Sequence, residues 1–249
     1  MSTSDGKPVI LIRKLHKSFG NQMVLNGVDL EVGHGETLMI LGRSGMGKSV
    51  LLKLIIGLQK PDSGSIQIGG KEIVGLSLNH LNEIRIRIGF LFQNAALYDS
   101  LTVAENVAFP LKRHTAMSAV EQKDCVHELL SRVGMEKARE KMPAEISGGM
   151  KKRVGLARAL ALNPEIMLSD EPTAGLDPIT AGEINDLIRE LKQERKMSSI
   201  VVTHDMHSAK TVSDSVALLD KGEIVIKGTF DDLEKSNNPF VAEFLKQSF

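Results

Sequence analysis

The sequence predicts an α/β domain whose parallel sheet is covered by helices and interrupted by a helical lobe. Short β-branched runs separated by glycine and aspartate occupy about residues 8–68, as a series of strands and turns requires. Strand signals disappear over about residues 94–162, where apolar residues recur with helical spacing. Strand patterns return at 166–168 and 199–203 around a helical pattern at 180–196, and this order is typical of parallel sheets.

Short apolar runs place the expected strands of the first part at 9–12, 28–32 and 38–41. A glycine-rich loop follows the third run, and residues 49–58 then have the pattern of a helix. A further apolar run at 88–92 predicts one more strand before the helical lobe begins.

The length and composition allow one domain with an inserted lobe. The chain has 249 residues, of which 42% are hydrophobic, so a sizeable core can form. We expect an α/β core at 8–93 and 163–230, a helical subdomain at 94–162 and a helical tail at 231–249. Residues 216–226 predict a β-hairpin near the end of the core. Because 31 basic residues balance 31 acidic residues, we expect no nucleic acid as a partner.

A cytosolic, reducing environment is expected for this chain. Its single cysteine, Cys125, cannot form an internal disulfide, and nothing near it indicates a nucleophile. No apolar run approaches the roughly 20 residues of a transmembrane helix. Residues 1–7 are polar and lack the apolar stretch of a signal peptide. We therefore expect the chain to reach a membrane only through another protein.

The glycine-rich loop after the run at 38–41 matches a phosphate-binding motif, G-x-x-x-x-G-K-[ST]. Glycines let backbone N–H groups converge on one anion, and the following helix presents its positive N-terminus. Lys48 would contact the β- and γ-phosphates of a bound nucleotide, and the Ser49 hydroxyl would bind Mg²⁺. A chance glycine-rich turn is the alternative, and the position between a strand and a helix argues against it. The motif consists of Gly42, Arg43, Ser44, Gly45, Met46, Gly47, Lys48 and Ser49.

Two carboxylates end the strand pattern Ile166-Met167-Leu168-Ser169-Asp170-Glu171, as in a Walker B motif. Asp170 is expected to hold Mg²⁺ through water, because this ion keeps most of its hydration shell. Glu171 is expected to orient and polarise the attacking water. The alternative is a pair of solvated acids at the end of a strand.

Five further matches, together with these two motifs, resemble the ATP-binding cassette (ABC) family. Ile146-Ser147-Gly148-Gly149-Met150 is similar to its signature, usually L-S-G-G-Q, and lies about twenty residues before the Walker B pattern. The others are the Q-loop position Gln93, the D-loop Gly175-Leu176-Asp177, the switch histidine His204 and the adenine-stacking aromatic Phe19. The resemblance covers about residues 9–230. It implies a P-loop NTPase domain with an inserted helical subdomain and an N-terminal antiparallel β element.

The resemblance also implies a homodimer in which each ATP site combines residues of both copies. Gln93 would reach Mg²⁺ and the water, and His204 would stabilise the γ-phosphate in the transition state. The signature would act on the nucleotide of the other copy. Taken alone, Ser-Gly-Gly is more often a helix cap, and a lone glutamine, histidine or phenylalanine is more often structural. The residues expected to act in trans are Ser147, Gly148, Gly149, Met150 and Asp177.

Three positions depart from the usual pattern of the family. Met150 and Ile146 replace a glutamine and a leucine in the signature, which leaves the backbone nest but removes a side-chain amide. Val50 stands where a threonine or serine is common, and its backbone N–H remains to meet the α-phosphate. We expect weaker nucleotide contacts and retained function.

One branch of the family is more similar still, the Mla/Mce branch, whose ATPases drive phospholipid or other lipid movement between bacterial membranes. This resemblance implies an integral membrane permease, an Mce-domain lipid-binding protein and a small STAS-domain protein as partners, at the cytoplasmic face of the inner membrane. The alternatives are the ATPase of a small-solute importer and a regulatory module that clamps ATP without hydrolysis. The presence of both Glu171 and His204 argues against the clamp. The similar segments are residues 91–103, 106–111, 146–153 and 177–180.

Two apolar segments indicate contact surfaces. Leu97, Tyr98 and Leu101 lie in a loop-like stretch and are expected to contact the permease, with local core packing as the alternative. The tail has apolar residues at helical spacing and is expected to pack on its own domain, with a neighbouring subunit or a regulatory protein as the alternatives. These tail residues are Phe240, Val241, Phe244, Leu245 and Phe249.

Overall fold

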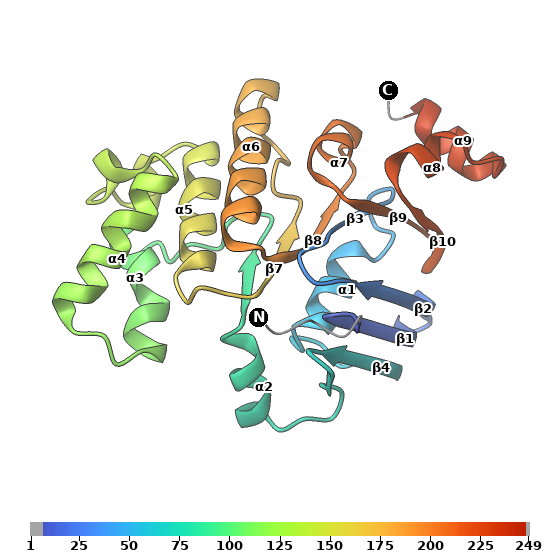
Figure 1. Cartoon of the computed structure of the whole chain (residues 1–249), viewed down its shortest axis with the longest axis horizontal. Coiled ribbons are helices and arrows are strands. Elements are labelled where there is room, and N and C mark those ends of the chain that lie inside the picture. Colours follow the sequence, from blue (N-terminus) through green and yellow to red (C-terminus); the bar gives the residue numbers. More distant parts are fainter. Residues whose placement is uncertain (1–6, 248–249) are drawn as a thin grey trace.

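A six-stranded sheet forms the centre of the fold (Figure 1). The structure is a computed structural model, and it describes residues 7–247. The strand order is β10-β9-β3-β8-β7-β6, in which the five strands from β9 to β6 are parallel and β10 is antiparallel at the edge. The strands are β3 (Thr37–Leu41), β6 (Ile88–Leu91), β7 (Ile166–Asp170), β8 (Ser198–Thr203), β9 (Ser215–Asp220) and β10 (Glu223–Gly228).

The central sheet separates two hydrophobic cores. Strands β3, β7 and β8 are buried along their whole length, as expected for parallel strands covered on both faces. Alternate residues of β3 enter different cores because successive side chains of a strand point to opposite faces. Leu38 and Ile40 belong to one core, and Met39 and Leu41 belong to the other.

A second, antiparallel sheet in the order β2-β1-β4-β5 packs beside the first. The predicted strands at 9–12 and 28–32 are longer than expected, because polar residues continue the pairing of β1 with β2 beyond the apolar runs. With this sheet present, the predicted fold class is confirmed. The strands are β1 (Ile10–Phe19), β2 (Gln22–Val32), β4 (Ser63–Ile68) and β5 (Lys71–Glu72).

Four helices belong to the core. Helix α1 (Lys48–Ile55) lies between the two sheets, and it ends earlier than predicted because Gly57 adopts a φ of 67°. Helix α6 (Pro178–Arg195) begins earlier than predicted, because the Asp177 side chain accepts bonds from two N–H groups of its first turn. The sequence pattern does not predict α2 (Leu78–Arg85), which buries only Leu81 and Ile84. Helix α7 is Met206–Val212.

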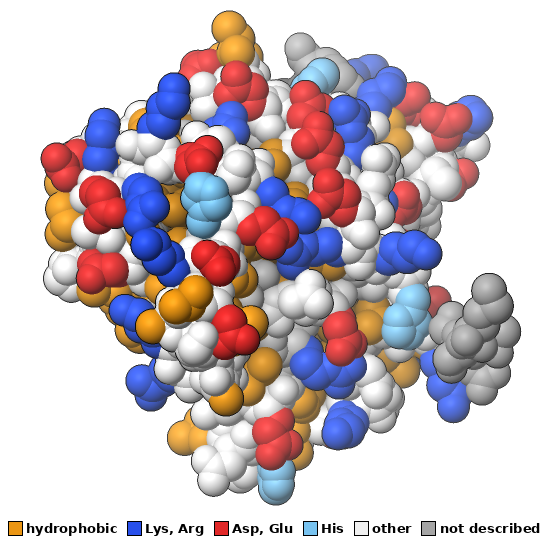
Figure 2. All heavy atoms as spheres, turned by 60° about the vertical axis from the view of Figure 1, so that its left-hand side comes forward, with side chains coloured by type: hydrophobic (Ala, Val, Ile, Leu, Met, Phe, Trp, Pro, Cys, Tyr) orange, Lys and Arg blue, Asp and Glu red, His pale blue; other side chains and the backbone are white. Residues whose placement is uncertain are grey.

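The helical lobe contains α3 (Val103–His114), α4 (Ala119–Arg132) and α5 (Gly148–Leu160), with two short 3₁₀ turns, Glu136–Ala138 and Pro143–Glu145, between α4 and α5. Capping boxes at Thr102/Glu105 and Ser118/Glu121 start α3 and α4. Figure 2 turns this lobe toward the viewer and shows acidic and basic side chains interspersed over that face. Within residues 7–247, no helix has the length and apolar character needed to cross a membrane.

The C-terminal part forms the predicted hairpin of β9 and β10 and then two helices. The tail was expected to be helical from residue 231, and it consists of α8 (Phe230–Glu234) and α9 (Pro239–Gln247). In α9, Val241 and Phe244 are 0% and 3% exposed and belong to the same core as the helical lobe. The tail therefore packs on its own domain. Phe249 lies outside the described residues.

Shortening Phe244 tests this packing. Phe244→Ala should lower the free energy of unfolding by about 3–5 kcal/mol, because it empties a buried aromatic site. Chemical denaturation of the purified chain measures the loss. Lys246→Ala, an exposed position of the same helix, is the matched control and should change stability by less than about 0.5 kcal/mol. Equal stability of the two variants would contradict the docking of α9 on its own core.

Candidate functional site

The phosphate-binding motif forms the turn between β3 and α1. Gly47 caps α1 with a φ of 94°, a conformation that side chains rarely tolerate. A Cβ atom at Gly47 would lie 2.9 Å from a methyl carbon of Val24 and 3.1 Å from one of Leu25. The loop therefore packs directly on β2, and glycine is required at this position both for conformation and for space.

Lys48 is the first residue of α1, and its side chain folds over the loop. The ammonium group donates hydrogen bonds to the carbonyl oxygens of Gly42 at 2.7 Å and Arg43 at 3.3 Å. It also lies 3.5 Å from Oε1 of Glu171, and Lys48 is only 5% exposed. A buried cation at the N-terminus of a helix makes this loop a strong site for a polyphosphate.

Ser49 and Asp170 place two oxygen atoms that can bind a metal ion side by side. The Ser49 hydroxyl donates a 2.7 Å hydrogen bond to Oδ1 of Asp170, which ends β7. Burial raises the pKa of the Asp170 carboxyl, and the bond from Ser49 partly opposes this shift. Mg²⁺ is usually bound by one or two protein oxygens together with water and phosphate oxygens. This donor pair therefore fits the ion.

Glu171 follows β7 with a left-handed backbone, φ 47°, and its N–H donates to the carbonyl of Val202 at 2.9 Å. Glu171 is 7% exposed, and its carboxylate lies between two nitrogen groups. Oε1 faces the Lys48 ammonium, and Oε2 lies 3.0 Å from Nδ1 of His204, whose side chain is mostly exposed. A carboxylate held in this way is oriented toward the space above the phosphate loop.

Nine of the predicted residues line one pocket of about 340 Å³ beside the phosphate loop, whereas the predicted Gly42, Arg43, Met46, Asp170 and His204 do not line it. Phe19 lies at its mouth, 47% exposed, with the Lys17 ammonium 5.3 Å from the ring centroid. Gln93 is exposed where β6 ends. Val24 is a lining residue that the sequence analysis missed, because nothing in its local pattern distinguishes it from other strand residues. The lining residues are Phe19, Val24, Ser44, Gly45, Gly47, Lys48, Ser49, Val50, Gln93 and Glu171.

The signature segment does not line this pocket, although all of residues 146–150 belong to the described part of the chain. The Ser147 hydroxyl caps α5 by accepting from the N–H of Met150 at 3.3 Å. Gly149 lets α5 approach α6, since a Cβ there would lie 2.6 Å from Thr180. Asp177 caps α6, and its hydrogen bond from Thr180 lowers the pKa of its carboxyl. Ser147 and Gly148 remain exposed.

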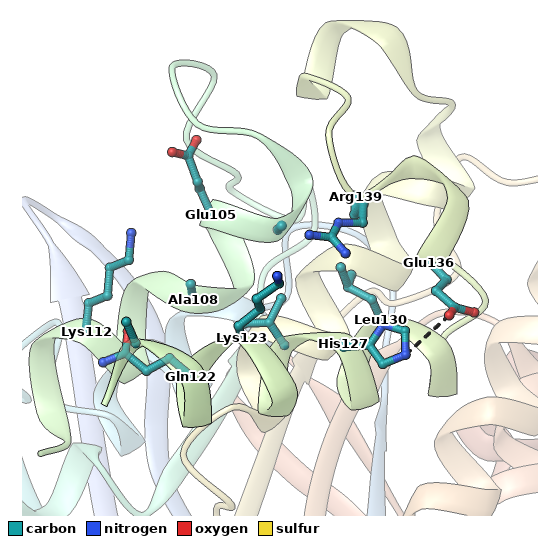
Figure 3. Close-up of a pocket in the computed structure, with 12 residues that line it drawn as sticks. Glu105, Ala108, Lys112, Gln122, Lys123, His127, Leu130, Glu136 and Arg139 are labelled. Atoms are coloured by element: carbon teal, nitrogen blue, oxygen red, sulfur yellow. Dashed lines mark ion pairs between the residues drawn. The ribbon is translucent and has the colours of Figure 1, made fainter. Parts of the chain in front are cut away.

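A second pocket, of about 220 Å³, lies between α3 and α4 in the helical lobe (Figure 3). Its wall includes the apolar side chains of Val126 and Leu130 and the cationic side chains of Lys112 and Lys123. His127 Nε2 lies 3.4 Å from a carboxylate oxygen of Glu136 across one end. None of the residues predicted for the nucleotide site lines this pocket.

A family model described as ABC transporter matches residues 25–174, more than half of the chain. This chain belongs to the ABC transporter family. The matched region contains the phosphate loop, Gln93, the signature and the Walker B carboxylates. The chain is therefore an ABC ATPase that binds ATP with Mg²⁺ and couples hydrolysis to transport.

Three proteins illustrate what this ABC ATPase is similar to. One is the "probable ribonucleotide transport ATP-binding protein mkl" of Mycobacterium leprae (strain TN), 43% identical over 236 residues, which cover 95% of this chain and 68% of the relative. Another is "Protein TRIGALACTOSYLDIACYLGLYCEROL 3, chloroplastic" of Arabidopsis thaliana, 40% identical over 258 residues, covering 97% and 74%. The third is a solved dimer of the ATP-binding cassette MJ0796 in a post-hydrolysis state with ADP and Pi. Its TM-score is 0.83 at 35% identity, over 88% of this chain and 98% of that one.

Asp170→Asn should increase the stability of this ABC ATPase and abolish its Mg²⁺-dependent turnover. A buried acid with a raised pKa opposes folding when it is ionised, and asparagine keeps the acceptor for Ser49 without the charge. We expect a higher free energy of unfolding at pH 7 by denaturant titration, with ATP hydrolysis reduced by orders of magnitude.

Because the pKa of Asp170 is raised in the folded protein, the stability difference between the variant and the wild type depends on pH. Below the pKa of an aspartate in the unfolded chain, near 3.9, the Asp170 carboxyl is neutral in both the folded and the unfolded state and does not oppose folding. As the pH rises through that value to the higher folded pKa, the wild type loses stability relative to the variant, and above it the difference is constant. A stability gain that grows as the pH falls would contradict the burial effect.

Proposed function

We propose that this ABC ATPase energises lipid transport between bacterial membranes through a separate integral membrane permease. The observation that carries the proposal is the likeness of residues 91–103 and of the Gly148-Gly149-Met150 signature to the Mla/Mce branch. The relative from Arabidopsis thaliana, which is named after a galactolipid, supports the same class of substrate. Partners of this assembly would be an Mce-domain lipid-binding protein and a STAS-domain protein, at the cytoplasmic face of the inner membrane.

Import of a small polar solute is the second candidate function. It is favoured by the mycobacterial relative whose name assigns ribonucleotide transport. Both candidates use the same ATPase cycle, so only the transported molecule separates them. The third candidate, a module that clamps ATP without hydrolysis, is disfavoured by the presence of both Glu171 and His204, whose Oε2 and Nδ1 atoms lie 3.0 Å apart.

In the proposed hydrolysis, Glu171 polarises the attacking water, and its contacts to Lys48 and His204 hold the carboxylate in place. Lys48 and the backbone N–H groups of the loop bind the phosphates, while Phe19 stacks on adenine and Gln93 approaches the water. Mg²⁺ held near Ser49 and Asp170 would neutralise charge on the β- and γ-phosphates. His204 stabilises the charge that develops on the γ-phosphate.

The proposed active site needs a second copy of the chain. The similar cassette MJ0796 is dimeric, and the signature of this chain lies away from its own phosphate loop pocket. A site that excludes water around the γ-phosphate needs donors on both sides. We therefore propose that Ser147 and the N–H groups of Gly148 and Gly149 cover the nucleotide bound by the partner copy, with Met150 and Asp177 at the same interface.

Complementation between two damaged subunits tests the shared site. Lys48→Ala and Ser147→Arg chains should each be inactive as homodimers, because each homodimer has two incomplete sites. Their heterodimer has one doubly damaged site and one intact site. Mixing differently tagged chains should restore ATP hydrolysis or trap one nucleotide per dimer. Heterodimers that form and yet neither hydrolyse nor trap nucleotide would contradict a site built from two copies.

The groove between β6 and α3 is the proposed docking site for the permease. It holds about 410 Å³ and is walled by aromatic side chains, with the rings of Tyr98 and Phe109 4.7 Å apart. Of the three residues expected here, Tyr98 is 47% exposed, whereas Leu97 and Leu101 are partly buried. Leu97 packs against the core of the lobe, so its side chain serves packing at least in part. Tyr98 is therefore the residue that best presents apolar surface to a partner helix.

Tyr98→Asp should detach the permease without unfolding the domain. We expect the variant to keep the unfolding midpoint of the wild type and to lose co-purification of the permease, identified by mass spectrometry. Val120→Asp, at a 68% exposed apolar position on α4, is the matched control and should retain the permease. In vesicles containing the wild-type complex, ATP-dependent movement of labelled phospholipid is expected. Movement of a ribonucleotide without phospholipid movement would contradict the lipid proposal.

A further inference from the structure

Helix α5 carries a buried lysine that contacts Glu171, the residue that follows strand β7. Lys152 lies in the second turn of α5 and is 5% exposed. Its ammonium group donates a 2.9 Å hydrogen bond to the backbone carbonyl oxygen of Glu171. Lysine is rarely buried to this degree, and a buried cation is costly unless it makes a specific contact. The contact it makes here is with the residue proposed as the catalytic base.

The backbone of Glu171 is the part of the site that most needs support. A φ of 47° places this glutamate in the left-handed region, which a residue with a Cβ seldom occupies. Its N–H is bonded to Val202, and its carbonyl accepts both from the N–H of Ala174 at 3.2 Å and from Lys152. Of these three bonds, only the one from Lys152 is made by a side chain of the helical lobe.

The orientation of the Glu171 backbone decides where its carboxylate points. The side chain leaves the backbone toward Lys48 and His204, with the two oxygens 3.5 Å and 3.0 Å from their nitrogens. The bond from Lys152 holds the carbonyl side of the Glu171 Cα, and the bond to Val202 holds its N–H side, so together they fix the Cα from which the carboxylate side chain leaves. A displacement of about 1 Å in a reacting group is sufficient to reduce a rate by roughly 100-fold.

We infer that Lys152 is a positioning residue for hydrolysis, which holds the Glu171 peptide so that the carboxylate faces the attacking water. It does so from α5, the helix that begins at the signature residue Ser147. The N-terminal half of one helix thus presents the signature and, one turn later, contacts Glu171 of its own chain. This inference rests on the catalytic role of Glu171 in the proposed function.

Removing the lysine donor tests the inference. Lys152→Met keeps the apolar stem and removes the donor, and in the full-length chain it should lower kcat roughly 10- to 100-fold. The KM for ATP and the affinity for nucleotide should change less than about twofold, because Lys152 does not line the nucleotide pocket. Lys152→Arg, which keeps a cationic donor, should recover most of the rate. Lys151→Met, the same change one residue earlier on α5, is the matched control and should leave kcat unchanged.

A double-mutant cycle shows whether Lys152 acts through Glu171. Glu171→Gln should reduce turnover by orders of magnitude, and adding Lys152→Met to it should cause no further loss. Equal losses from Lys152→Met with and without the Glu171 carboxylate would overturn the inference, as would a Lys152→Met chain with wild-type kcat. If Lys152→Met does not fold, Lys152→Gln takes its place in both comparisons. If Glu171→Gln alone keeps more than half of the turnover, the proposed role of Glu171 fails, whatever Lys152 does.

Discussion

The parallel pairing of β3, β8 and β7 is the constraint on which the rest of the site depends. Leu41 pairs with Thr203 and Asp170 pairs with Val202, so the carboxyl ends of the three strands are level. The loops that follow them meet at one edge of the sheet, where ligands bind in folds of this kind. This register brings together a lysine, a glutamate and a histidine from three distant parts of the chain.

Charge is concentrated inside the protein at this edge. Lys48, Lys152, Asp170 and Glu171 are all 7% exposed or less. Buried charges cost stability even when they are paired, and the raised pKa of Asp170 is the direct sign of that cost. The Lys48 ammonium lies 3.5 Å from Oε1 of Glu171, and both carboxylates favour the charged form of Lys152, which limits the penalty. The hydrophobic cores on both faces of the sheet supply the stability that offsets it.

Helix α5 takes part both in the exposed signature and in the buried surroundings of Glu171. Its N-terminal turn exposes Ser147 and Gly148. Its next turn carries the buried Lys152, which donates a hydrogen bond to the backbone carbonyl of Glu171. Close packing on α6 through Gly149 fixes the helix relative to Asp177, which caps α6. The exposed turn and the buried turn therefore belong to one helix that is packed on both α6 and Glu171. In a dimer like that of MJ0796, the proposed arrangement would link the nucleotide of one copy to the catalytic carboxylate of the other.

Local sequence determined the phosphate loop, the Walker B carboxylates, the caps of α3 to α6 and, apart from α2, the order of the main strands and helices. Each depends on the conformational preference of a few adjacent residues, such as the positive φ of Gly47 or the capping oxygen of Asp177. The tertiary structure alone decided the contacts between distant segments. Val24 in the pocket wall, the Ser49–Asp170 bond, the burial of Leu97 and the Lys152–Glu171 bond belong to this group. A side chain leaves no local pattern for a partner many residues away, so only folding shows which groups meet.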